Sequence, residues 1–245
     1  GREVLYFDQE RFADPAKSIR GGIPVLFPIC GNLPDDRLPL ACGDFSLKQH
    51  GFARDLPWQI ELLGDQSGVM LSLTDCADSR RVYPFGFRIQ MELRPLSASL
   101  EVSVTIANTS VSTGEPMPFS FGLHPYFNVS DLSLTAVEGL PDHCFNHLEM
   151  AEAETSAQLS RLAQGVDFLT HPGGPVTLVD EQAGTRLQLH HHEPMDLTVV
   201  WTDPPRAMVC VEPWTGPRQA LISGDRRLEL CAGESTRLCC RYSLN

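Results

Sequence analysis

The sequence predicts an all-β protein, most easily built as a sandwich of two large sheets. Short runs with period-two or β-branched character recur along the chain, and Gly, Pro, Asp and Asn separate them. Only one segment has helical character. The 19 prolines and 19 glycines among 245 residues also favour turns and shaped loops over helices.

The clearest strand covers residues 99–106, SLEVSVTI, in which four apolar side chains alternate with Ser, Glu, Ser and Thr. Such alternation is typical of a strand with one face against a core and one face in water. The full set of predicted strands is residues 4–7, 58–63, 69–74, 87–93, 99–107, 176–179, 185–191, 197–201, 208–211 and 236–243.

Two further segments stand apart from these strands. Residues 151–164 are rich in Ala, Glu, Leu and Gln, but their apolar stripe is weak, so a short surface helix and a loop fit equally well. Residues 21–34 form a Gly- and Pro-rich loop that is too apolar for a solvated linker. We expect that loop to line something rather than to lie free in solvent.

Composition and charge narrow the class of protein. No linker or shift in composition divides residues 1–245, which predicts a single domain. The net charge of −12 argues against nucleic acid as a partner, so an anionic ligand would need a local group of arginines. No apolar run approaches the roughly 18 residues of a membrane span, and no signal segment is evident. We therefore expect a cytoplasmic protein, a monomer or weak dimer, without a membrane partner.

Neither the cysteines nor the histidine cluster predicts a metal site. The eight cysteines are scattered without a Cys-x-x-Cys pair, which indicates reduced thiols rather than a disulfide framework or a zinc site. In the run HHHE at residues 190–193, only His190 and His192 would share a strand face, and no third ligand lies at metal spacing nearby. Solvated histidines at a strand end are the preferred interpretation.

Two short segments some ninety residues apart hold the candidate chemistry. Residues 121–127, FGLHPYF, and 209–214, VCVEPW, each place one titratable group, His124 or Glu212, among aromatic and apolar neighbours. An imidazole and a carboxylate in such settings could form an acid and base pair in a small pocket. A satisfied core histidine and a strand-end carboxylate are the alternative interpretation of each residue taken alone.

Two arginines next to glycine turns are candidates for ligand binding. Arg20 precedes Gly21-Gly22, and Arg54 closes the run QHGFAR at residues 49–54. Forked guanidinium hydrogen bonds could grip ring hydroxyls or a phosphate, although ordinary surface ion pairs are the alternative. Serine-hydrolase chemistry has little support because no Gly-x-Ser-x-Gly elbow occurs. A glycosidase needs two acids in one pocket, and only Glu212 and Asp167 can be nominated.

Four segments, taken together, resemble the aldose 1-epimerase (mutarotase) family, and in particular its branch similar to hexose-6-phosphate mutarotases. They are RGGIPVLFP at residues 20–28, HGFAR at 50–54 followed by PW at 57–58, LHPYF at 123–127 and VEPW at 211–214. The resemblance implies a β-supersandwich (galactose mutarotase-like) fold of one domain. Family members usually have further strands before a start such as Gly1-Arg2-Glu3, so we expect either that the N-terminus was trimmed or that the first hairpin is missing from this sequence.

The resemblance further implies a role for each matching residue. His124 would be the acid and Glu212 the base, while His50 would assist near the ring oxygen. Asp167, in the segment GVDFL at residues 165–169, resembles the family's sugar-hydroxyl ligand, although the residues after it depart from the family pattern. Arg20 and Arg54 resemble the positions that face the phosphate in the sugar-phosphate branch.

The expected activity is the interconversion of α and β anomers of a hexose, or of a hexose 6-phosphate, by acid/base ring opening without a metal or organic cofactor. For this role His124 should be partly protonated and Glu212 ionised at neutral pH. Tyr126, Phe127 and Trp214 could exclude water or stack on the sugar. The competing class is a non-catalytic module that binds a sugar or sugar phosphate, which would need no pair of His124 and Glu212.

Overall fold

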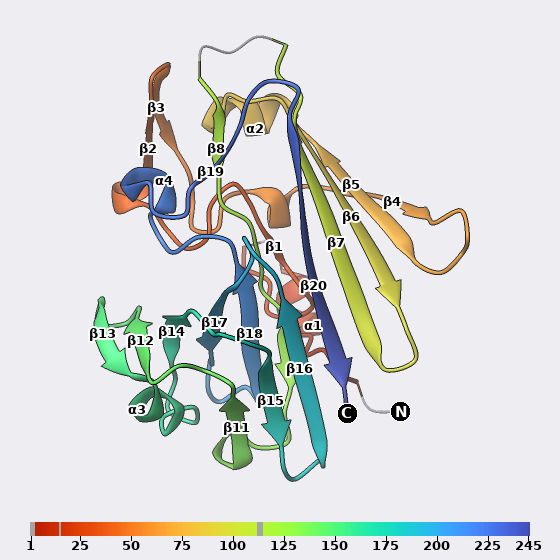
Figure 1. Ribbon diagram of the computed structural model, residues 1–245, viewed down its shortest axis with the longest axis vertical. Helices are drawn as coiled ribbons and strands as arrows, with labels where there is room; N and C mark the ends of the chain where they lie inside the picture. The colour runs from red at the N-terminus through yellow and green to blue at the C-terminus, as the bar shows by residue number, and fades with distance from the viewer. Residues whose placement is uncertain (1–2, 15, 112–114) are drawn as a thin grey trace.

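The computed structural model describes residues 3–14, 16–111 and 115–245, and it confirms the all-β prediction (Figure 1). Two eight-stranded sheets dominate the structure, and neighbouring strands within each are antiparallel. All eight cysteines are free. No helix in these ranges is long and apolar enough to cross a membrane. That the chain forms a single domain stays a prediction.

The first sheet runs in the order β1, β9, β18, β17, β14, β12 and β13, with β10 also paired to β18. Its strands are β1 (Val25–Leu26), β9 (Gly122–Leu123), β10 (Tyr126–Asn128), β12 (His143–Asn146), β13 (Ala151–Glu154), β14 (Asp167–Thr170), β17 (Leu197–Trp201) and β18 (Met208–Trp214). The central strand β18 is buried along its whole length.

The second sheet runs in the order β11, β15, β16, β20, β7, β6, β5 and β4, and its long strands lie side by side in Figure 1. These strands are β4 (Gln59–Leu62), β5 (Val69–Thr74), β6 (Phe87–Pro95), β7 (Ser99–Asn108), β11 (Thr135–Glu138), β15 (Val176–Asp180), β16 (Thr185–His191) and β20 (Ser235–Leu244). The predicted alternation in β7 is confirmed, since Val102, Val104 and Ile106 are buried.

Smaller elements connect the two sheets. The strands β2 (Arg37–Leu40) and β3 (Gly43–Ser46) form a hairpin, and β8 (Met117–Phe119) pairs with β19 (Leu228–Leu230), which comes much later in the chain. The helices are short: α1 (Gln9–Phe12), α2 (Ala77–Val82), α3 (Thr155–Leu159) and α4 (Ala220–Ser223), with 3₁₀ turns η1 (Pro34–Asp36), η2 (Ala53–Asp55) and η3 (Leu132–Leu134).

The main hydrophobic core joins the inner faces of the two sheets. Val209 and Val211 of β18 belong to the same apolar cluster as the buried residues of β6, β7 and β20. Phe127 and Tyr242 meet across the sheets with ring centroids 5.3 Å apart. Because side chains alternate along a strand, Cys210, Glu212 and Trp214 point to the opposite, outer face of the first sheet.

Two sequence-based predictions need correction. Residues 4–7 form no strand, since Leu5 and Phe7 make only isolated bridges to Phe127 and Gly21 as the chain passes the sheet. Residues 151–164 are not one helix: they begin as the edge strand β13, which pairs with β12, and then turn into the short helix α3. Pairing with β12 overrides the helical propensity of the first four residues.

Candidate active site

Sheet register brings the two titratable residues together. Gly122 pairs with Trp214, and Tyr126 pairs with Cys210, so the interruption between β9 and β10 places His124 across from Glu212. The same interruption suits Pro213, which has no N–H to donate toward that side. Side chains opposite one another across antiparallel strands share a face, which explains how two residues distant in sequence come into contact.

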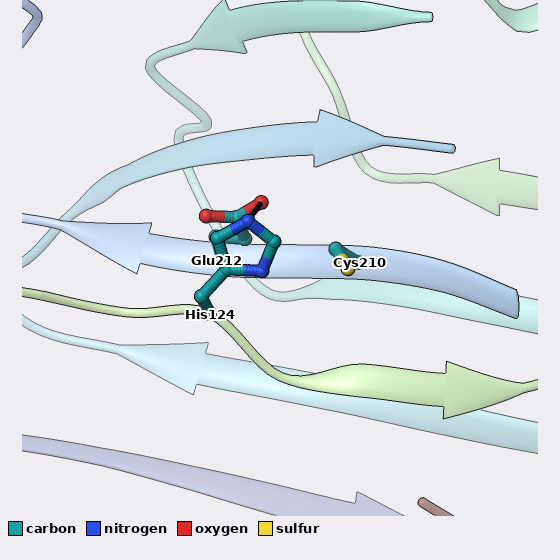
Figure 2. A group of neighbouring side chains, drawn as sticks. All are labelled: His124, Cys210 and Glu212. Atoms are coloured by element: carbon teal, nitrogen blue, oxygen red, sulfur yellow. Dashed lines mark ion pairs between the residues drawn. The ribbon is translucent and has the colours of Figure 1, made fainter. Parts of the chain in front are cut away.

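His124 and Glu212 form a direct contact inside a pocket. His124 Nε2 lies 3.3 Å from Glu212 Oε1, and the two residues are 8% and 1% exposed. The indole N–H of Trp214 donates to Glu212 Oε2 at 3.1 Å. The His124 ring stacks on Tyr126 with centroids 4.8 Å apart, and its backbone N–H donates to the Pro24 carbonyl. Both members of the pair are thus held in place (Figure 2).

Burial shifts the pKa values of His124 and Glu212 in opposite directions. Desolvation lowers the pKa of His124, and the Arg54 charge adds to this shift. Desolvation also raises the pKa of Glu212 well above its usual range, and the Asp167 charge adds to that rise. Both shifts favour the uncharged forms of the two groups, whereas the acid role that the family resemblance implies for His124 needs a protonated imidazole. A neutral imidazole beside a carboxylic acid carries the same single proton as an imidazolium beside a carboxylate.

The pocket around the pair has a volume of about 220 Å³. It contains all seven residues that the sequence nominated, which come from distant parts of the chain. The lining residues are Ser18, Arg20, Gln49, His50, Arg54, His124, Tyr126, Asp167, Val199, Trp201, Glu212, Trp214 and Arg218. Phe127, in contrast, points into the core between the sheets and is 3% exposed, so it cannot stack on a ligand in the pocket.

His50 presents a fixed hydrogen-bond donor. Its Nδ1 accepts from the Gly31 N–H at 3.1 Å, and its backbone N–H donates to the Gly31 carbonyl at 2.6 Å. A neutral imidazole that accepts at Nδ1 carries its proton on Nε2. Burial and the neighbouring His124 lower the pKa of His50 well below its usual range, so the ring is neutral. The apolar loop around Gly31 thereby supports the site from behind, although none of residues 21–34 lines this pocket.

Asp167 is held by two residues that the sequence analysis missed. His147 Nδ1 lies 2.7 Å from Asp167 Oδ1, and Arg218 donates to Asp167 Oδ2 at 2.7 Å. The His147 ring also stacks on Trp214, with centroids 6.1 Å apart. Arg218 follows a Gly-Pro turn, so the argument used for Arg20 could have found it. No feature of the local sequence singles out His147, because only the register of β12 and β14 brings it to Asp167.

The two predicted arginines differ in their partners. Arg20 donates through Nε to Asp203 at 3.3 Å, and its guanidinium lies 5.3 Å from the centroid of the Trp201 ring. Arg54 donates to the backbone carbonyl of Gln49 at 3.0 Å, and within the described ranges it forms no ion pair. Arg54 is therefore the cation of this pocket with its charge available to a ligand.

The comparisons with known proteins agree with this fold. The sequence model of the aldose 1-epimerase family matches residues 2–243. The chain belongs to the aldose 1-epimerase family. Its fold matches that of the Slr1438 protein from Synechocystis sp. PCC 6803, with a TM-score of 0.93 and 32% identity over 100% of this chain and 85% of that one.

Other relatives are more distant or only partly covered. A galactose mutarotase related enzyme from Lactobacillus acidophilus has the same fold, with a TM-score of 0.74 and 21% identity over 91% of this chain and 82% of that one. A Cenchrus ciliaris protein named "Putative glucose-6-phosphate 1-epimerase" is 34% identical over 152 residues. That match covers 57% of this chain and 42% of the relative's length.

Proposed function

We propose that this protein interconverts the α and β anomers of a hexose by opening and reclosing the sugar ring, with His124 as the acid and Glu212 as the base. The observation that carries the proposal is the contact of 3.3 Å between these side chains in a ligand-sized pocket of an aldose 1-epimerase family member. One imidazole and one carboxylate are the two groups that the reaction requires.

Mutarotation needs one proton removed from the anomeric hydroxyl and one delivered to the ring oxygen. Glu212 accepts the hydroxyl proton while His124 donates to the ring oxygen, so the bond between the anomeric carbon and the ring oxygen breaks and an aldehyde forms. A sugar hydroxyl that donates to Glu212 favours its carboxylate, and the proton then passes to His124 through their contact. Rotation of the aldehyde and the reverse transfers complete the reaction.

The other pocket residues orient the sugar in this proposal. His50 donates its Nε2–H near the ring oxygen, and Asp167, held by His147 and Arg218, accepts from a sugar hydroxyl. Trp214 offers an indole surface for the apolar face of the ring. Each proton transfer contributes roughly 10²–10⁴-fold to the rate, and the chemistry uses these side chains alone.

The test of the base is Glu212→Gln, followed by exchange NMR of fresh α-D-glucose, glucose 6-phosphate and galactose. We expect anomer exchange to fall by about 10²-fold or more while sugar binding, measured by calorimetry, persists. Glu61→Gln, which changes an exposed glutamate on β4, is the matched control and should leave the rate unchanged. Anomer exchange at the wild-type rate in Glu212→Gln would show that Glu212 is not the base. Sugar binding without exchange in the wild type would favour the non-catalytic binding module.

We further propose that the preferred hexose carries a 6-phosphate, bound by Arg54 with help from Arg20. Two observations support this substrate: the guanidinium of Arg54 forms no ion pair within the described ranges, and the Cenchrus ciliaris relative is named a "Putative glucose-6-phosphate 1-epimerase". We expect Arg54→Met to raise KM for glucose 6-phosphate by roughly tenfold, the value of one charge-assisted contact, while KM for glucose changes little. Arg88→Met, on the exposed face of β6, is the control. Equal effects on both sugars would exclude the phosphate role.

A further inference from the structure

The reaction proposed above leaves unused one buried thiol next to the acid and base pair. Cys210 precedes Glu212 by two residues on β18, so both side chains lie on the outer face of the sheet; the His124 ring lies in front of Glu212, with Cys210 to one side (Figure 2). The ligand atoms of the three residues all lie within 4.8 Å of one another, and each residue is buried. A nitrogen, a sulfur and an oxygen donor thus converge, and His124 and Glu212 line the pocket while Cys210 lies buried behind them beside Tyr126 and Met208.

The donor atoms are available and oriented. Nδ1 of His124 is buried without a hydrogen-bond partner within the described ranges, although the residue is only 8% exposed. Nε2, 3.3 Å from Glu212 Oε1, is the nitrogen placed to share a metal ion with that carboxylate, and Nδ1 then carries the ring proton. Glu212 Oε2 accepts from Trp214, which leaves Oε1 facing His124. The Cys210 thiol has only a weak contact with the Met208 sulfur at 4.0 Å.

We propose that His124, Cys210 and Glu212 form a binding site for a divalent metal ion of zinc-like softness, and that metal binding and anomer exchange exclude each other. Zn²⁺ takes imidazole, thiolate and carboxylate ligands in a tetrahedral arrangement, with a water molecule in the fourth position when three ligands come from protein. The fourth position would face the pocket. The metal would bind both proton-transfer groups and so stop anomer exchange. The inhibition therefore rests on the proposed function, whereas metal binding itself does not.

Geometry and charge both favour this class of ion. Ligand atoms around tetrahedral zinc lie roughly 3.3–3.8 Å apart, and the His124–Glu212 contact of 3.3 Å already has that spacing. The indole N–H of Trp214 supplies the second-layer hydrogen bond that orients a metal-binding carboxylate. The same pocket is lined by Arg20, Arg54 and Arg218. Their positive charges repel cations that bind only by electrostatic attraction. The site therefore selects a metal that bonds to sulfur and nitrogen over Mg²⁺ or Ca²⁺.

The direct test uses Co²⁺ as a spectroscopic probe of the protein after chelator treatment. We expect the wild type to bind Co²⁺ with a thiolate-to-cobalt charge-transfer band that Zn²⁺ displaces and Mg²⁺ does not. Cys210→Ser should lose the band, and Cys144→Ser, which changes another buried cysteine, should retain it. Circular dichroism of each variant checks that it folds, and Cys210→Ala replaces any serine variant that does not. Absence of the band in wild type, or its persistence in Cys210→Ser, overturns the site.

The functional test measures anomer exchange against Zn²⁺ concentration. We expect wild-type exchange to be inhibited, and Cys210→Ser to need roughly tenfold more Zn²⁺ for the same fractional inhibition of its own basal rate. Equal Zn²⁺ sensitivity of the two proteins overturns the mutual exclusion. A cobalt band that depends on Cys210, in a protein without anomer exchange on any sugar, leaves the metal site standing and rejects the proposed function instead.

Discussion

At the scale of single residues, the pocket depends on groups held by their neighbours rather than by their own backbone. Glu212 is oriented by Trp214, His50 by Gly31, and Asp167 by both His147 and Arg218. Burial makes the single proton of the His124–Glu212 pair a property of the two residues together. Small displacements of the supporting residues should therefore affect exchange while leaving the fold intact.

Gly31 is the residue at which this dependence is most easily tested. Its φ is +76°, and a Cβ at this position would lie 2.3 Å from Cγ of Arg218. We expect Gly31→Ala to displace Arg218 and His50 and to lower kcat/KM for anomer exchange by roughly tenfold to 10²-fold, because misplacement of about 1 Å has effects of that size. Exchange NMR of the purified variant measures the change.

Gly184→Ala is the matched control for that substitution. Gly184, in the turn between β15 and β16, has a φ of +62°, and a Cβ there would meet no atom within 4 Å. Both variants carry a similar left-handed strain of about 1–2 kcal/mol, but only Gly31→Ala creates a clash. Similar activities of the two variants would show that Gly31 does not support the pocket.

At the scale of elements, Asp196 ties the start of β17 to neighbouring segments. Its Oδ2 lies 2.8 Å from Nε2 of His171, which follows β14, and its Oδ1 pairs with Arg226. Arg226 also donates to the carbonyl of Thr215, just after β18. Burial alone raises the pKa of Asp196, but the His171 hydrogen bond and the Arg226 charge outweigh it, so the net pKa is lowered.

A lowered pKa in the folded state gives this link a defined pH dependence. The contacts of Asp196 with His171 and Arg226 stabilise the fold fully at pH values above the pKa of an unfolded aspartate, near 3.9. This stabilisation is lost as the pH falls through the lower pKa that Asp196 has in the folded protein. We expect Asp196→Asn to lower the melting temperature at pH 7 and to flatten its decline between about pH 5 and pH 3. Asp44→Asn, which breaks an exposed pair with Arg37, is the control. Parallel pH curves for the wild type and Asp196→Asn would contradict the assignment.

At the scale of the whole molecule, a cluster of aromatic rings closes one end of the core. Phe87 of β6 is fully buried, with its ring centroid 5.0 Å from Phe27 and 5.8 Å from Phe52. We expect Phe87→Ala to reduce the free energy of unfolding by about 3–5 kcal/mol, because it removes a buried ring and leaves a cavity. Urea unfolding monitored by circular dichroism measures the loss.

Phe12→Ala provides the comparison for that core substitution. Phe12 is 59% exposed and has a single ring neighbour, Phe7. Its removal should change the free energy of unfolding by less than about 0.5 kcal/mol. If Phe12→Ala and Phe87→Ala reduced the free energy of unfolding equally, side-chain burial would not explain which residues stabilise this fold.

The long strands could be predicted from sequence because each carries its own alternating or β-branched pattern. The predicted runs 69–74, 185–191 and 197–201 coincide with β5, β16 and β17. The short strands β1, β9 and β10 could not be predicted, since two or three residues hold no period, and partners distant in sequence define them. The predicted run 208–211 is shorter than β18, which continues to Trp214. Proline normally marks the end of a central strand, but Pro213 is tolerated here because the neighbouring strand is interrupted beside it.

By itself the sequence determined the all-β class and the main strands, and it predicted seven of the side chains that line the pocket, because hydrophobic period and residue chemistry are local properties. The tertiary structure decided how those side chains work together. Sheet register set His124 against Glu212, joined His147 and Arg218 to Asp167, turned Phe127 into the core and placed Cys210 beside the pair. These contacts depend on pairing between strands distant in the chain, and no local pattern encodes that pairing.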